Sequence, residues 1–145
     1  MNILRINCSP QGRASESLRL SQRLVDRLAQ SAEGARCRIT EIDATALPHV
    51  DLDYARALSA VADPSEDILG RGALRQSGQL IELLQSATHI VIATPMHNFT
   101  VPSSLKVWID HVVRVRSTFK ITPEGKVGTL ADRPVYVAIS SGGEF

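Results

Sequence analysis

Hydrophobic positions along this chain fall into four short runs, separated by longer segments with a helical repeat. The runs cover residues 2–7, 36–42, 89–94 and 134–140, and each has the length of a β-strand. Between them, apolar residues recur every three or four positions, as on one face of an amphipathic helix. The expected helices cover residues 15–30, 53–62, 73–86 and 103–115. This alternation predicts one α/β domain, residues 1–145, with a parallel sheet and helices on both faces.

Weaker signals refine this picture. The run 36–42 contains few apolar residues, which favours a position near the edge of the sheet. Gly70 and Gly72 interrupt the helical pattern before residue 73. Residues 119–130 contain Pro123 and several glycines, which predicts a loop with a short hairpin.

Composition and charge exclude several classes of protein. The net charge is +1 and the basic residues are dispersed, which argues against nucleic-acid binding and against the acidic docking surface of an electron carrier. No apolar run approaches the roughly 20 residues that span a bilayer, and the first residues are too short a run for a signal peptide. Cys8 and Cys37 have no metal-ligand spacing and are expected to be reduced thiols. These observations predict a cytoplasmic protein without a bound metal.

The first candidate site is the loop from Ser9 to Ser17, which leads from the first strand into the first helix. Free N–H groups at a helix N-terminus attract a phosphate, and serine hydroxyls can donate to its oxygens. An ordinary turn capped by Ser15 is the alternative. The loop has one glycine, Gly12, and no lysine, so it is neither a P-loop nor a dinucleotide fingerprint.

Two further loops follow strands. Residues 95–101 combine the polar Asn98 with the apolar Met96 and Phe99, which suits a planar heteroaromatic ligand. Residues 140–143 end in two glycines, which let a backbone approach a ligand closely. Each loop is by itself also compatible with a plain surface turn. In a sheet ordered 2-1-3-4, however, all three loops converge at one edge.

Five short motifs in this order resemble those of a known enzyme family. They are Ser9 with Ser15-Glu16-Ser17, residues 95–99, Leu105-Lys106-x-Trp108-Ile109-Asp110, Thr118-Phe119, and Ser140-x-Gly142-Gly143. The chain is similar over nearly its whole length to the FMN-dependent NAD(P)H azoreductases and quinone reductases. The resemblance implies a flavodoxin-like, doubly wound parallel sheet of order 2-1-3-4.

The resemblance also implies a cofactor and the residues that hold it. FMN would be the cofactor, NADH or NADPH the reductant, and a quinone or an azo compound the acceptor. The serine loop would hold the phosphate, and the other two loops would border the isoalloxazine ring. The implied cofactor-binding residues are Ser9, Ser15, Glu16, Ser17, Pro95, Met96, His97, Asn98, Phe99, Ser140, Ser141, Gly142 and Gly143. No side chain is assigned a catalytic proton transfer.

Two departures from the family pattern stand out. His97 occupies a position where the family often has tyrosine, and it either tunes substrate access or has no such role. The chain also ends where family members continue with a fifth strand and a last helix, which would leave the fourth strand as a sheet edge. The family implies a homodimer, with Trp108 and Phe119 as interface candidates. Trp108 is equally suited to the core.

Two rival functions remain open from the sequence. One is an electron carrier or a plain FMN-binding module without substrate turnover. The other is a shortened chain that folds but binds no flavin. The nucleophile elbow of acyl-transfer hydrolases does not occur in the sequence, which disfavours a phosphodiesterase.

Overall fold

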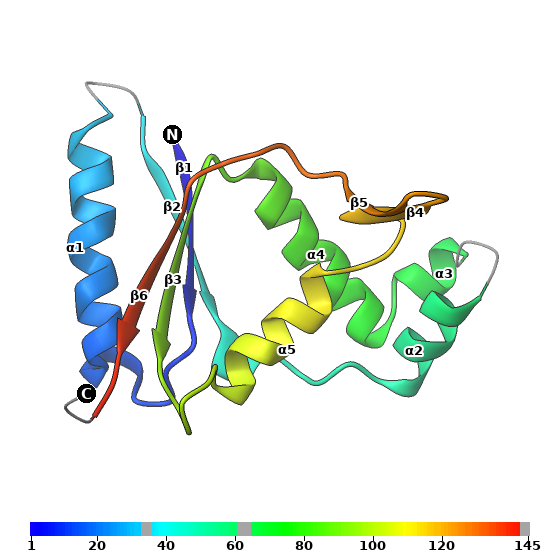
Figure 1. Ribbon diagram of the computed structural model, residues 1–145, viewed down its shortest axis with the longest axis horizontal. Coiled ribbons are helices and arrows are strands. Elements are labelled where there is room, and N and C mark those ends of the chain that lie inside the picture. Colours follow the sequence, from blue (N-terminus) through cyan, green and yellow to red (C-terminus); the bar gives the residue numbers. More distant parts are fainter. Residues whose placement is uncertain (33–35, 61–64, 143–145) are drawn as a thin grey trace.

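A computed structural model describes residues 1–32, 36–60 and 65–142 of the chain. The main sheet has the order β2-β1-β3-β6, and every pair in it is parallel. Its strands are β1 (Asn2–Asn7), β2 (Arg38–Asp43), β3 (His89–Pro95) and β6 (Val135–Ser140). The helices are α1 (Glu16–Gln30), α2 (Leu52–Ser59), α3 (Glu66–Leu69), α4 (Gly72–Ser86) and α5 (Ser103–Val112). Helix α1 covers one face of the sheet, and α4 and α5 cover the other (Figure 1). The predicted doubly wound sheet and its strand order are confirmed.

Alternate residues of each central strand enter different cores. Ile3 and Val91 point toward α1 and pack with Val25. Leu4 and Ile6 point the other way, into a larger cluster. That cluster takes its helical members from α4 and α5: Leu80, Ile81, Leu84, Leu105, Trp108 and Val112. Because side chains alternate between the faces of a strand, a two-sided sheet needs such nearly continuous apolar strands. Trp108 is only 7% exposed, so it belongs to the core of this chain.

The boundaries of two expected helices differ from the structure. Helix α5 ends at Val112 and not at 115. The Thr118 hydroxyl donates to the Val112 carbonyl at 2.7 Å and accepts the N–H of Arg114 at 3.0 Å, so the chain turns there. Helix α2 ends at Ser59, and the last two residues of the expected helix 53–62 lie outside the described residues. Strand β2 begins at Arg38, two residues later than expected, and forms the predicted edge of the sheet.

Asp51 holds the N-termini of two helices together. Its Oδ1 accepts the N–H of Tyr54 in α2 at 2.8 Å, and its Oδ2 accepts the N–H of Ala73 in α4 at 3.0 Å. These hydrogen bonds lower the pKa of the Asp51 carboxyl. Gly72 makes the close approach possible: its φ is +47°, and a Cβ there would lie 2.7 Å from the Asp51 carboxylate. The predicted break in the helix at Gly70 and Gly72 is therefore also a packing requirement.

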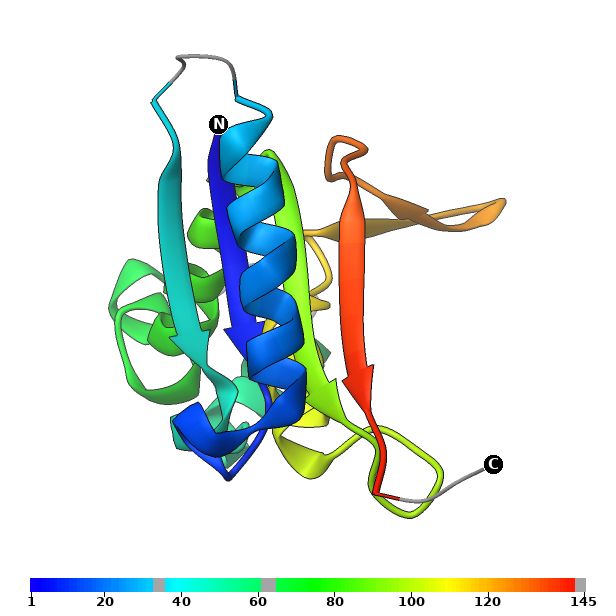
Figure 2. The same cartoon turned by 90° about the vertical axis from the view of Figure 1, so that its left-hand side faces the viewer.

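Residues 113–134 pass beside the α4 and α5 layer before the last strand. They include the predicted hairpin, formed by β4 (Phe119–Thr122) and β5 (Gly125–Gly128), which projects from the body of the molecule (Figure 2). Arg133 then donates to the carbonyls of Leu84 and Ala87 at the C-terminal end of α4, where a cation is favourable. None of the described helices has the length and apolar character needed to cross a membrane.

Strand β6 is the second edge of the described sheet. Val135, Val137 and Ile139 share one of its faces and are each about half exposed, at 53%, 49% and 54%. Its other face is covered, since Tyr136 packs into the α1 cluster and Ala138 is buried. The expectation of an edge strand with open hydrogen-bonding groups is met in the part of the chain that the structure describes.

Candidate functional site

The three loops singled out in the sequence meet at the carboxyl ends of β1, β3 and β6, at the lower end of the sheet in Figure 1. Together they line a hollow of about 320 Å³, which we call the rim hollow. Its lining residues are Ser9, Pro10, Gln11, Ser15, Glu16, Pro95, Met96, His97, Ser140, Ser141 and Gly142. Ligands of open α/β sheets bind at this edge, where the connections from neighbouring strands diverge.

The first loop is shaped by its own hydrogen bonds. The N–H of Ser9 donates to Asn7 Oδ1 at 3.2 Å, and the N–H of Gln11 donates to Ser9 Oγ at 3.3 Å. A short 3-10 turn, η1 (Gly12–Ala14), follows and begins at Gly12 with a φ of +52°. The Ser9 side chain is buried at 3% exposure. The loop therefore has a fixed shape along one wall of the rim hollow.

Helix α1 begins at this wall. Ser15 is its N-cap, with its hydroxyl accepting the N–H of Leu18 at 3.4 Å. The hydroxyls of Ser15 and Ser17 lie 2.9 Å apart, and both residues are buried. Glu16 pairs with Arg19 at 2.7 Å, which offsets its negative charge at the mouth of the hollow. The N–H groups of the first turn have no acceptor within the helix and carry its positive dipole end.

The second loop contains a tight turn with an unusual residue in it. His97 and Thr100 exchange two backbone hydrogen bonds of 3.0 and 2.9 Å. The two residues between them, Asn98 and Phe99, have φ angles of +51° and +59°, as in a type I′ turn. Asn tolerates this backbone, but an aromatic residue rarely adopts it. Phe99 is also 86% exposed, and strained, exposed residues of this kind are concentrated at ligand sites.

The third loop is tied to the second by the sheet. Ser140 pairs with Pro95 at the end of the β3–β6 ladder, and the N–H of Met96 donates to the Ser140 carbonyl at 2.7 Å. Gly142 follows, and a Cβ there would meet no atom within 4 Å. Contacts with the described residues thus do not require the glycine, which leaves open space where it lines the rim hollow.

Most of the expected site residues line this hollow, but some do not. The side chain of Ser17 lies behind Ser15, and Asn98 and Phe99 are beyond the hollow, on the turn. Gly143 lies outside the described residues. Pro10 and Gln11 line the hollow although they were not among the expected residues. Their place between Ser9 and Ser15 in a loop with a fixed shape is the signal that could have identified them.

Cys8, beside the first loop, and His111, in the last turn of α5, have redox or metal-binding potential, but both are buried in the structure. Cys8, which adjoins the first loop, is fully buried, and this burial together with nearby Asp43 raises the pKa of its thiol to about 12. His111 is also buried, and its ring Nε2 lies 2.8 Å from the Pro48 carbonyl. Within the described ranges, no three His, Cys, Asp or Glu side chains are grouped as a metal site would require.

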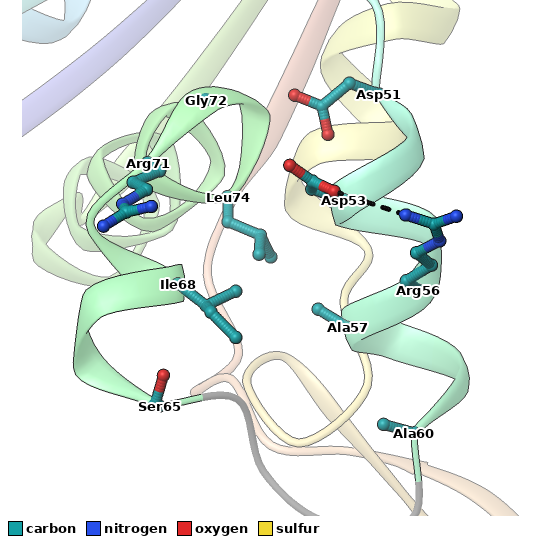
Figure 3. A pocket seen from close by; sticks show the side chains of 10 residues that line it. All are labelled: Asp51, Asp53, Arg56, Ala57, Ala60, Ser65, Ile68, Arg71, Gly72 and Leu74. Carbon is teal, nitrogen blue, oxygen red and sulfur yellow. Dashed lines mark ion pairs between the residues drawn. The ribbon is translucent and has the colours of Figure 1, made fainter.

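A second cavity, of about 460 Å³, lies away from these loops between α2 and the start of α4 (Figure 3). Ala57, Ile68 and Leu74 form its apolar floor. The charged groups at its border already have partners: Arg56 pairs with Asp53, Arg71 pairs with Asp67, and Asp51 accepts two backbone N–H groups. We assign no function to it, because it contains none of the loop residues that converge at the sheet.

A parallel α/β sheet with a hollow at its carboxyl rim, walled by a helix N-terminus, defines a class of ligand-binding proteins. The chain belongs to the family described as flavodoxin-like fold, whose model matches residues 1–145. The family that the motifs indicated is therefore confirmed.

Relatives within this family have a consistent description. The chain is 42% identical over 142 residues to FMN-dependent NADH:quinone oxidoreductase 5 of Burkholderia lata, covering 98% of this chain and 67% of the relative. It is 44% identical over 146 residues to FMN-dependent NADH:quinone oxidoreductase 2 of Cupriavidus pinatubonensis, covering 99% and 69%. The chain thus spans about two thirds of the length of the curated relatives it matches.

Solved structures lead to the same family. The chain matches the crystal structure of an FMN-dependent NADH-azoreductase from Bacillus anthracis in complex with FMN with a TM-score of 0.79 and 26% identity. The match covers 99% of this chain and 70% of the other. The relatives' names agree with the cofactor, reductant and acceptor classes expected from the motifs.

Proposed function

We propose that this chain binds FMN in the rim hollow and uses NADH to reduce quinones and azo compounds. The observation that carries the proposal is the convergence of the three loops on one hollow at the carboxyl rim. Relatives named FMN-dependent NADH:quinone oxidoreductases, at 42% to 44% identity, support the reductant and the acceptor class.

The residues present suit a phosphorylated, flat cofactor. The phosphate end needs donors, and the first wall offers the hydroxyls of Ser9 and Ser15 beside the free N–H groups at the start of α1. The flat end needs apolar contact and room, which Met96 and the open space at Gly142 offer. This donor set is neutral, and Arg13 in the same loop is a candidate to add positive charge.

Each wall then has a separate task. Ser9, Ser15 and the first turn of α1 would bind the phosphate, while Ser17 positions the Ser15 hydroxyl. Pro95 to Phe99 and Ser140 to Gly142 would border the ring, with backbone groups held in place by the turn and by the Met96–Ser140 hydrogen bond. The chemistry that FMN supplies when bound is hydride transfer from NADH to the acceptor. We assign the chain's residues binding and orientation, and no proton transfer.

The proposal includes a homodimer in a reducing, cytoplasmic environment. Apolar side chains exposed at the end of α5 and on the hairpin support an interface there: Val113 is 57% exposed, Ile121 69% and Val127 44%. Both cysteines are unpaired thiols, as is usual in the cytoplasm.

The test is titration of the purified chain with FMN, followed by NADH oxidation with a quinone acceptor. Binding should quench flavin fluorescence at one FMN per chain, and the loaded protein should oxidise NADH only when the quinone is present. Binding without turnover would favour an electron carrier or a plain FMN-binding module. Absence of binding would refute the proposal.

A further inference from the structure

A smaller hollow adjoins the rim hollow on the side of α5. It has a volume of about 260 Å³, and Pro10 and His97 line both spaces. His49 lies on its wall, so we call it the histidine hollow. A molecule lying against the rim hollow would therefore have a second compartment within reach, directly beyond His97.

Half of the ten residues that line the histidine hollow are apolar, and the other half are polar. Ala44, Leu47 and Val107 contribute aliphatic surface, and Pro10 and Pro102 add two rings. The apolar half suits contact with an aromatic ring.

The polar groups of the histidine hollow favour a negative charge. His49 and His97 are its only lining side chains that can carry a charge, and no carboxylate lines it in the described structure. Asp43, which precedes the lining residue Ala44 in the chain, accepts both the N–H and the hydroxyl of Thr45 and is turned to that residue. Neither imidazole has a hydrogen-bond partner or ion pair in the described part of the chain. An imidazole N–H donates to an anion whether the ring is neutral or protonated.

We propose that the histidine hollow binds the anionic substituent of an aromatic acceptor, such as a sulfonated or carboxylated quinone or azo compound. This inference rests on the proposed function and makes it more specific. His49 and His97 are then specificity-determining residues: they donate to the anion while the apolar walls enclose the ring that carries it.

The first test measures binding without turnover. Naphthalene-2-sulfonate and its neutral counterpart naphthalene-2-sulfonamide are titrated into the chain, with and without FMN, and the imidazole proton resonances are followed by NMR. The sulfonate should bind about tenfold more tightly and shift the resonances of His49 and His97. H49Q and H97Q should each reduce this preference. H89Q is the matched control, because His89 lies at the opposite, amino end of β3 and bonds to Thr88.

The second test uses the FMN-loaded chain with 1,4-naphthoquinone and its 2-sulfonate as acceptors. The ratio of the KM of the sulfonated quinone to that of the neutral one should rise about tenfold in H49Q and stay constant in H89Q.

Three results would overturn the inference: equal binding of the sulfonate and the sulfonamide, an unchanged KM ratio in H49Q, or a change in H49Q confined to the KM of NADH. The last result would indicate that His49 contributes to binding NADH rather than the acceptor. If the chain turns over no acceptor at all, the proposed function fails, and the binding test still decides whether the histidine hollow takes an aromatic anion.

Discussion

At the scale of single residues, Ser15 and Ser17 combine structural roles with a proposed role in binding. Ser15 caps α1, lines the rim hollow and contacts the Ser17 hydroxyl at 2.9 Å. Both side chains are buried although both are polar, and a buried hydroxyl is costly unless it is hydrogen-bonded. Their mutual hydrogen bond meets part of this requirement, and a bound phosphate would meet more of it.

Replacing Ser15 and Ser17 with alanine should weaken FMN binding at least tenfold. A hydrogen bond to a charged group contributes about 1.5–3 kcal/mol, and the double variant removes at least one such bond. Fluorescence titration measures the dissociation constant, and circular dichroism verifies the fold. S31A is the control, since Ser31 ends the same helix and donates to the Leu28 carbonyl far from the hollow. An unchanged dissociation constant for FMN in the double variant would contradict the proposed phosphate site at the start of α1.

The two thiols should react very differently. Burial raises the pKa of the Cys8 thiol to about 12, so at pH 8 it remains protonated and inaccessible. Cys37 is only partly buried. With a disulfide reagent at pH 8, one thiol per chain should react rapidly and the second only in denaturant. The C37S variant should show no rapid reaction, and a fast thiol in that variant would contradict the assignment.

At the scale of elements, the junction of α2 and α4 depends on two residues that differ in kind. Asp51 contributes acceptors for N–H groups of both helices, and Gly72 contributes the absence of a side chain. The first follows a common capping pattern. The second is visible only where the two helices meet.

Replacing Gly72 with alanine should lower the free energy of unfolding by about 1–3 kcal/mol. The new Cβ would lie 2.7 Å from the Asp51 carboxylate, at a φ of +47° that alanine adopts only with strain. G78A is the matched control in the same helix: a Cβ there meets no atom within 4 Å, and it should stabilise by about 0.5–1 kcal/mol. Urea denaturation measures both, and equal effects would contradict the assigned clash.

The Asp51 contribution should depend on pH. Its backbone hydrogen bonds hold the pKa of this carboxyl below the ordinary value of 3.8, so they stabilise the fold above that value. The stabilisation is lost as the pH falls through the lowered pKa. D51N should therefore unfold at a lower temperature than the parent at pH 7, with the difference shrinking below pH 3.8. D53N is the neighbouring control, and a D51N difference that is constant with pH would refute this role.

At the scale of the whole molecule, the sheet order decides which loops meet. Because β3 and β6 lie side by side, residues 95–100 and 140–142 share one rim with the first loop. The same order leaves β6 at an edge of the sheet, and the hairpin projects from the body of the molecule (Figure 2). One face of β6 is apolar and half exposed, and the hairpin presents a second apolar surface. Two surfaces are thus available for association, and the proposed homodimer uses the hairpin with the end of α5 rather than the edge strand β6.

Charged substitutions should distinguish these surfaces. I121E places a carboxylate on the hairpin, where Ile121 is 69% exposed, and should convert the dimer to a monomer. V137E places one on the open face of β6 and should leave the dimer intact while reducing any further aggregation. Sedimentation velocity measures the oligomeric state. Dissociation in V137E but not in I121E would move the interface to the sheet edge.

The sequence by itself determined the local structure and the chemistry offered by the loops. Periodicity located the four strands of the main sheet and helices α1, α2, α4 and α5 to within a few residues, because apolar spacing reflects which face of an element is buried. The position of Ser15 before a helical pattern predicted its role as an N-cap. The motifs in the three loops indicated the flavodoxin-like family and, with it, FMN as the ligand.

Only the tertiary structure decided which of these groups meet. It joined the three loops around one hollow and placed the Ser17 side chain behind Ser15. It also brought His49 and His97 to the same hollow, although 47 other residues separate them in the chain. It also ended α5 at Val112 through the Thr118 hydroxyl. The physical reason is that periodicity and capping are local properties of the chain, whereas a hollow is formed by residues that come together only when the strands pair.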